Sequence, residues 1–317
     1  MAKYKLPKIE EMFEAGVHIG HQARRWHPKM EKYIFTVEKK IHIINLEQTE
    51  KLLENACEFL YKTASEGGQI IFVGTKRQAS ATVKAEAERC GALFVTERWL
   101  GGTITNFRVI KKSIDKLLTN LKKRESGEFQ VYTKKERLMI DREIDNLQRF
   151  IGGIASLRGR PDAMFVVDPR KEKTAVREAK RFKIPVIALI DTNSDPTDVD
   201  YPLPGNDDAI RSISVMVGAV SNAIEEGYKA FAKNKDKVEA VKEEEAKVVK
   251  EVESDAPSLK INTDETVVKD AEAILKAEDT LPLGTEVVIN TAVGESEPVV
   301  EESKEKEKKS TATKSKK

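Results

Sequence analysis

Short runs of consecutive apolar residues alternate with helix-like segments through the middle of the chain. Four of these runs are predicted β-strands, at 69–75, 92–97, 163–168 and 184–191. Helices are predicted to follow the first and third strands, at 77–90 and 172–182. Strands that are apolar on both faces are typical of a parallel sheet with helices packed on each side. The pattern therefore predicts an α/β fold with an open parallel sheet flanked by helices.

Further helices are predicted on either side of this repeating part. Two of them lie at 8–15 and 46–65. A longer one follows the run Asn-Asp-Asp at 206–208, because these residue types cap helix N-termini. Its apolar stripe consists of Ile210, Ile213, Val217, Val220 and Ile224. Residues 16–35 have little periodicity, so we expect an irregular segment there.

Residues 104–151 are predicted to form two helices folded back on each other. The apolar stripe of the first helix consists of Ile104, Phe107, Ile110, Ile114, Leu117 and Leu121. The second helix repeats its apolar residues with alternating steps of four and three, at Ile140, Ile144, Leu147, Ile151 and Ile154. Gly127 and the poor helix formers at 129–133 indicate a turn between them. We therefore expect an inserted antiparallel helical hairpin with coiled-coil packing.

The charge is distributed unevenly along the chain. Residues 1–227 carry 38 Lys and Arg against 32 Asp and Glu, whereas residues 228–317 carry 17 against 21. The second part also has too few large apolar residues to bury a core. We expect a folded domain at 1–227 and a charged, largely disordered tail at 228–317, whose first part can continue as a charged helix.

Cysteine usage and hydropathy predict a soluble, cytoplasmic protein. Cys57 and Cys90 both fall inside predicted helices, which favours reduced, buried thiols over a disulfide framework. No apolar run approaches the roughly 20 residues of a membrane span. The N-terminus lacks the apolar core of a signal peptide.

The predicted hairpin is basic on its polar side. The stretch 107–150 carries 12 Lys and Arg against 7 Asp and Glu. Because the apolar stripes are used inside the hairpin, this charged side is free to bind a polyanion such as RNA. The residues predicted to contact phosphate are Arg108, Lys111, Lys112, Lys122, Lys123, Arg124, Lys134, Lys135 and Arg137.

A second basic cluster lies in the irregular N-terminal segment. Arg24, Arg25 and Lys29 flank the ring of Trp26. This composition suits an extended segment that lies on the surface of the α/β domain, with the ring as its anchor and the arginines facing outward toward phosphate and sugar. Nearby histidines raise the possibility of zinc; they are His18, His21 and His27. Their spacing matches no usual zinc pattern, and the neighbouring arginines would repel a cation. No metal or other cofactor is expected.

The carboxyl ends of the predicted strands leave an enzyme hypothesis open, because ligands of such folds bind there. Lys76 with Arg77, and Arg170 with Lys171, could bind phosphate at helix starts. The carboxylates that could hold magnesium are Asp168, Asp191 and Asp195, although these residues also suit turns and a helix start. Neither a GxGxxG nor a Walker motif is present, so a scaffold with basic loops is favoured over a nucleotide-binding enzyme.

The segment 97–107 joins the last predicted strand before the insertion to the hairpin. Arg98 and Trp99 offer a charge and a stacking surface for RNA, and Gly101-Gly102 allows a sharp turn. The same residues suit a packing hinge at the root of the hairpin, with Gly152-Gly153 as the counterpart on the return. Both interpretations remain open.

Several of these motifs together resemble the bacterial small-subunit ribosomal protein two family. They are GVHIGHQARRWHPKMEKYIF, ERWLGGTITNF, PDAMFVVDPRKEKTAVREAKRFKIPVIALIDTNSDP and YPLPGNDDAIRSI, and the resemblance covers about residues 3–227. It implies a flavodoxin-like α/β domain that binds small-subunit ribosomal RNA and has no catalytic activity. It also implies neighbouring small-subunit ribosomal proteins as partners, with docking of the large ribosomal protein one in many bacteria.

Overall fold

The computed structural model describes residues 4–254, with side chains described through 234. The side chains discussed below lie in the compact unit Met1–Glu251. The predicted disorder of 228–317 falls largely outside the described residues. The helix α7 (Ile210–Ser254) does run through Gly227, so the backbone continues as a helix where the charge pattern changes.

A five-stranded parallel sheet forms the centre of the fold. Its strand order is β5-β4-β6-β7-β8, the order of flavodoxin-like folds. The strands are β4 (Ile70–Val73), β5 (Leu93–Val95), β6 (Ala163–Val167), β7 (Val186–Ile190) and β8 (Tyr201–Pro204). Four of them were predicted from apolar runs. The fifth, β8, was not, because Pro202 and Pro204 lack the N–H that an interior strand needs; they are tolerated here because β8 is at the edge.

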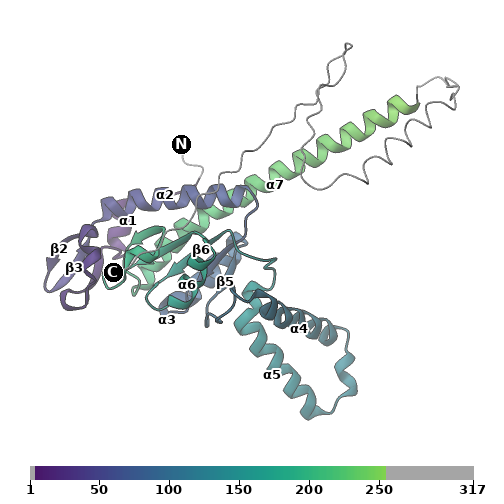
Figure 1. Ribbon diagram of the computed structural model, residues 1–317, viewed down its shortest axis with the longest axis horizontal. Coiled ribbons are helices and arrows are strands. Elements are labelled where there is room, and N and C mark those ends of the chain that lie inside the picture. The colour runs from purple at the N-terminus through teal and green to yellow at the C-terminus, as the bar shows by residue number, and fades with distance from the viewer. Residues whose placement is uncertain (1–3, 255–317) are drawn as a thin grey trace, which may run out of the picture. The chain divides into compact units, whose positions relative to one another are not determined.

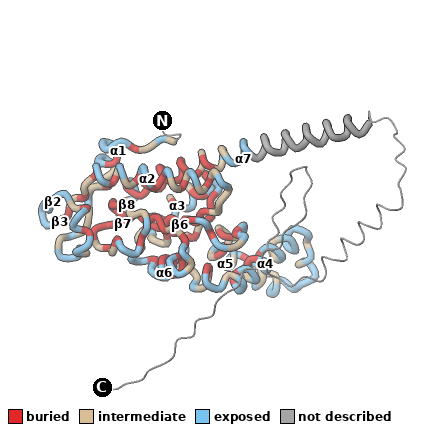
Figure 2. Tube along the Cα trace, turned by 45° about the horizontal axis from the view of Figure 1, so that its top comes forward, coloured by how far each residue is buried: buried red, intermediate tan, exposed pale blue. Residues whose placement is uncertain are grey.

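Helices cover both faces of this sheet, as the apolar strands predicted. The helices on one face are α2 (Leu46–Ser65), α3 (Arg77–Cys90) and α7, which pack on Phe72 and Phe165. The other face packs against α6 (Lys173–Arg181) and the inner end of the hairpin. Figure 1 shows the parallel strands between α2 and α6, and Figure 2 shows that these strands are the most continuously buried part. Cys57 and Cys90 are buried free thiols, as expected.

A small antiparallel sheet, which the sequence did not predict, occupies much of the N-terminal segment. It follows α1 (Ile9–Glu14) and has the order β1-β3-β2, with β1 (Ile19–Gln22), β2 (Ile34–Glu38) and β3 (Ile41–Ile44). The turn between β2 and β3 places Lys39 and Lys40 at φ +48° and +67°. Such turns usually carry Gly or Asn, so the Lys-Lys pair gave no turn signal.

The predicted hairpin is present as α4 (Phe107–Glu125) and α5 (Lys134–Ile151). Its first helix begins three residues later than the stripe suggested. Thr133 begins the second helix with a capping box to Glu136. The buried stripe residues are Ile104, Ile110, Ile114, Leu117, Ile144, Ile151 and Ile154. Coiled-coil packing of the two helices stays a prediction.

Short 3-10 helices complete the connections between the main elements. They are η1 (Ala23–Arg25), η2 (Pro28–Tyr33), η3 (Glu128–Val131), η4 (Gly152–Ile154) and η5 (Pro196–Asp198).

Just before α7, the side-chain oxygen of Asn206 accepts hydrogen bonds from the N–H groups of Asp208 and Ala209. These bonds form a turn that ends directly before the helix, whose first hydrogen bond runs from the N–H of Ile213 to the carbonyl of Ala209. Capping of α7 by the side chains of 206–208 is therefore not seen, and Asp207 contacts Lys76 instead.

Candidate nucleic-acid interface

The hairpin presents a row of uncompensated positive charges to solvent. Of the nine basic residues predicted there, eight are exposed and Arg137 is half-buried. Within the described part of the chain, only Lys123 of the nine forms an ion pair, at 4.0 Å from Glu128. On α4, residues 108, 111, 112, 122 and 123 point away from the buried stripe, because a helix turns about 100° per residue. We call these nine residues the hairpin surface.

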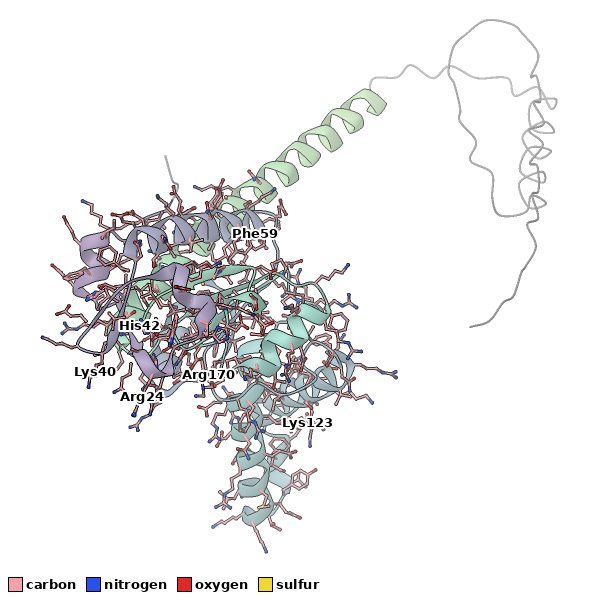
Figure 3. The ribbon with its side chains drawn as sticks, turned by 60° about the vertical axis from the view of Figure 1, so that its left-hand side comes forward. Arg24, Lys40, His42, Phe59, Lys123 and Arg170 are labelled. Atoms are coloured by element: carbon pink, nitrogen blue, oxygen red, sulfur yellow. The ribbon has the colours of Figure 1, made fainter. Side chains whose placement is uncertain are left out.

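The N-terminal basic segment lies on the small sheet. Arg24 and Arg25 form η1 and are exposed, with no ion pair to any described residue. The ring of Trp26 lies 5.2 Å from the ring of buried His42, centroid to centroid, and remains 36% exposed. The ring thus anchors the segment to the small sheet. Figure 3 labels Arg24 on the α/β domain and Lys123 on the hairpin.

A cavity of about 430 Å³ opens beside this segment, at the carboxyl ends of β6 and β7. Four of its lining residues are cationic and two are acidic: Arg25, Arg170, Lys173 and Arg177, with Asp195 and Asp198. The ring of Trp26 lines it as well. A groove with a cationic excess and an aromatic wall can hold a phosphate and stack a base. We call it the edge groove.

Lys29 is already paired within the protein. Its ammonium lies 3.0 Å from Asp195 Oδ2 and also donates to the hydroxyl of Thr197 at 3.0 Å. Burial tends to raise the pKa of the Asp195 carboxyl, but the hydrogen bonds that it accepts from Thr197 and Lys29 hold this pKa well below its usual range. Lys29 therefore fastens the basic segment to η5 and is less available to RNA than Arg24 and Arg25.

Trp99 is part of the core at the hairpin root. It is 6% exposed, so its ring has no face for a base, and the stacking interpretation is wrong in this structure. Its indole N–H donates to Glu178 of α6 at 3.4 Å. The same carboxylate accepts the backbone N–H groups of Gly102, Ile104 and Thr105 at 2.7, 3.0 and 3.2 Å. The hinge interpretation therefore holds for Trp99, while Arg98 remains exposed.

Lys76, predicted to bind phosphate, instead lies among carboxylates at the edge of the parallel sheet. Its ammonium is 2.8 Å from Asp207, 2.6 Å from Asp208 and 3.8 Å from Asp168. Although burial alone lowers the pKa of Lys76, the hydrogen bonds to Asp207 and Asp208 raise it. An ammonium held by three carboxylates is not available to a phosphate. The prediction that Lys76 contacts RNA is therefore wrong. Arg77 next to it is exposed.

The three N-terminal histidines do not converge on one point. His18 stacks on Phe13, with ring centroids 4.2 Å apart, and the His27 ring lies 3.8 Å from Asp195. His21 points toward the cluster around Lys76, where its Nδ1 is 2.9 Å from Asp191 Oδ2. Asp195 is paired with Lys29 instead. Asp168, Asp191 and Asp195, which were considered as possible magnesium ligands, do not form a ligand cluster among the described residues.

The sequence matches the family model described as Ribosomal protein S2 over residues 12–227. This range contains the parallel sheet, the hairpin and the N-terminal basic segment. The chain belongs to the ribosomal protein S2 family. Members of the S2 family are structural, non-enzymatic proteins of the small ribosomal subunit, and membership places this chain in the ribosome. No helix within residues 4–254 is long and apolar enough to cross a membrane.

Proposed function

We propose that this S2-family chain binds small-subunit ribosomal RNA through two basic surfaces, the hairpin surface and the edge groove. The observation that carries the proposal is the exposed, nearly unpaired row of cations on the hairpin. Surface lysines of a scaffold protein commonly have acidic neighbours three or four residues away, as Lys84 has in Glu88. Several cations of the hairpin surface also have an acidic residue at this spacing, as Lys111 and Lys112 have in Asp115, but only Lys123 forms an ion pair with a described residue. The other charges are therefore available to an external polyanion.

The two surfaces suit different parts of an RNA. The hairpin surface is convex and rich in lysine, which favours contacts to phosphates of a duplex without reading its bases. The edge groove combines guanidinium groups with the Trp26 ring, which favours an unpaired nucleotide that can stack. Neighbouring ribosomal proteins, including ribosomal protein one, are further proposed partners of the N-terminal segment.

Charge neutralisation on the hairpin tests the proposal. The variant changes Lys111, Lys112, Lys122 and Lys134 together to Gln. Each lost phosphate contact removes about 0.9 from the slope of log affinity against log salt, so we expect the slope for purified small-subunit RNA to fall by about 3–4. Filter binding over a salt series measures it.

A matched variant separates this effect from a general loss of charge. Lys51, Lys62, Lys84 and Lys229 are exposed, lie on α2, α3 and α7, and belong to neither surface. Their change to Gln removes the same four charges and should leave the slope within about 1 of the wild type. Equal slopes for the hairpin variant and the wild type would show that the hairpin cations are a solvated face, and the proposal would be lost.

A further inference from the structure

A groove of about 600 Å³ lies at the root of the hairpin. It is bounded by α3 and by the inner end of α5, with β5 and η4 between them. Since β5 is the edge strand of the parallel sheet, the groove lies where the sheet ends and the hairpin begins (Figure 1). None of its lining residues belongs to the hairpin surface or to the edge groove. We call it the root groove.

The root groove is acidic, in contrast to the two basic surfaces. Its charged lining side chains are three carboxylates and two cations, which are Glu88, Glu97 and Asp145 with Lys84 and Arg149. Both cations already have partners within the groove. Lys84 lies 4.0 Å from Glu88. Arg149 lies 3.6 Å from Glu97. Asp145 has no ion pair or hydrogen bond with any described residue, so one negative charge remains uncompensated.

The groove also offers hydrogen-bonding groups and an aromatic ring. The side chains of Thr96 and Gln148 line it and have no hydrogen-bond partner among the described residues. The half-buried ring of Phe94 lies against Gly153, where an added Cβ would be 2.6 Å from the ring. A hydroxyl and an amide can bond to the N–H and C=O groups of an extended peptide. An aromatic ring can pack on its apolar side chains or on a guanidinium.

The charges of the root groove disfavour two other classes of ligand. A phosphate group would face three carboxylates, whose repulsion opposes binding, so the groove does not suit RNA. The carboxylates do not converge on one point either, because they form no group of three potential metal ligands among the described residues. The groove therefore suits an elongated ligand whose positive charges are spread along it.

We propose that the root groove binds an extended basic segment of another protein. One Lys or Arg side chain of that segment pairs with Asp145. A second reaches Glu97 or Glu88, each of which keeps one carboxylate oxygen without a partner among the described residues. The backbone of the segment bonds to Thr96 and Gln148. This inference goes beyond RNA binding and does not depend on it, since no cation of the hairpin surface lines the groove.

A segment bound in the root groove would contact both the α/β domain and the hairpin. Lys84 and Glu88 belong to α3, whereas Asp145 and Gln148 belong to α5. The bound segment would therefore hold the hairpin against the α/β domain, in addition to the bonds that Glu178 accepts at the turn before α4.

Binding of a basic peptide to the full-length protein tests this inference. The probe is a fluorescein-labelled decapeptide of alternating Arg and Ala, and a decapeptide of alternating Glu and Ala is its control. Fluorescence anisotropy should show saturable binding of the first peptide and no binding of the second. Asp145→Asn with Glu97→Gln should weaken binding by about fivefold or more, the effect of losing two exposed ion pairs.

A matched variant removes the same two charges elsewhere. Glu125→Gln with Asp141→Asn changes exposed carboxylates of the hairpin that do not line the groove, and it should bind the peptide as the wild type does. Gln148→Trp fills the groove without a change of charge and should also weaken binding by about fivefold or more. Gln148 is exposed, so this variant should fold, and urea unfolding checks that it does.

Photo-crosslinking within assembled small subunits identifies the class of the natural ligand. Gln148 is replaced by p-benzoylphenylalanine in the full chain, and subunits are reconstituted from purified components. We expect a crosslink to a Lys- or Arg-rich protein segment, identified by mass spectrometry of the crosslinked peptide.

The inference is overturned if the groove variants bind the Arg peptide as tightly as the wild type does. A crosslink from position 148 to RNA, or none in assembled subunits, would overturn it as well. These variants leave all nine cations of the hairpin surface in place, so failure of the root groove and failure of RNA binding are distinguishable.

Discussion

Gly153 lies where the chain returns from the hairpin to the sheet, and its backbone passes directly over β5. A Cβ at this position would lie 2.3 Å from the carbonyl oxygen of Phe94 and 2.6 Å from its ring. The first contact is with backbone, which cannot rotate away as a side chain can. The glycine is therefore required by packing and not by an unusual backbone conformation.

Gly153→Ala should destabilise the protein by about 1–3 kcal/mol, the usual cost of forcing extra volume into a packed site. Gly101→Ala is the control at the other side of the hairpin root. It has nothing within 4 Å of the added Cβ, so its free energy of unfolding should stay within about 1 kcal/mol of the wild type. Urea unfolding of the two variants measures the difference. Equal stabilities would mean that the return segment moves aside freely.

For single residues, the sequence indicates a local role, such as a turn or a helix start, better than it indicates a partner from a distant segment. The Asn-Asp-Asp run indicated a helix cap, but Asn206 forms a turn before α7 and does not reach the N–H groups of its first turn. Asp207 was assigned the same role, but its carboxylate faces Lys76, 131 positions away in the chain. The phosphate-binding role expected for Lys76 was wrong for a similar reason. Three carboxylates from other segments enclose its ammonium, and no local sequence pattern reveals them.

Among the elements, one buried carboxylate of α6 holds the root of the hairpin in place. Glu178 of α6 accepts three backbone N–H groups of the turn 102–105 and the indole N–H of Trp99. Hydrogen bonds to an ionised acceptor are stronger than neutral ones, and these four fix the direction in which the chain leaves the sheet toward α4. Nothing in the sequence of α6 indicated this role, since Glu178 is one of several charged residues there.

Glu178→Gln should cost about 2–6 kcal/mol, because one carboxylate oxygen becomes an amide NH₂ and two buried donors lose their acceptor. Glu143→Gln serves as the control. Glu143 is an exposed partner of Lys116 on the hairpin, and its loss should change the free energy of unfolding by less than about 1 kcal/mol.

Hydrogen exchange locates the effect of Glu178→Gln. The amides of residues 102–105 should exchange faster in the variant, while those of the central strand β6 should change only as global stability does. Unchanged exchange at 102–105 would contradict the role given to Glu178.

Regular elements with strong periodicity could be predicted closely, and those with unusual turns could not. The predicted bounds 46–65 and 77–90 coincide with α2 and α3. The small sheet escaped because its turn uses Lys39 and Lys40 at positive φ, and β8 escaped because of its prolines. Both missed elements contain residue types that are unusual at their positions, so local sequence patterns do not reveal them.

At the scale of the whole molecule, the open question is which partner meets the N-terminal segment. Arg24 and Arg25 are exposed and lie next to the edge groove, and a guanidinium pairs equally well with phosphate and carboxylate. Ribosomal RNA and the acidic face of a neighbouring ribosomal protein are thus both chemically suitable. We favour RNA, because Arg170, Lys173 and Arg177 extend the positive charge across the groove.

Changing Arg24 and Arg25 together to Gln distinguishes the two partners. If RNA is bound, incorporation into small subunits in competition with the wild type should fall, and the salt slope of RNA binding should decrease by about 1–2. If a protein is bound, incorporation should persist while the subunit loses ribosomal protein one. Lys51→Gln with Lys62→Gln on α2 removes the same charge and should do neither.

Trp26→Ala completes this test. The Trp26 ring packs on His42 and also lines the edge groove, so both stability and binding can depend on it. We expect its loss to weaken RNA binding at every salt concentration without changing the slope, because the ring carries no charge. Filter binding beside a urea unfolding curve separates the two roles. Reduced stability with unchanged RNA affinity would show that the ring serves only to pack β3, and that the RNA surface ends at Arg25.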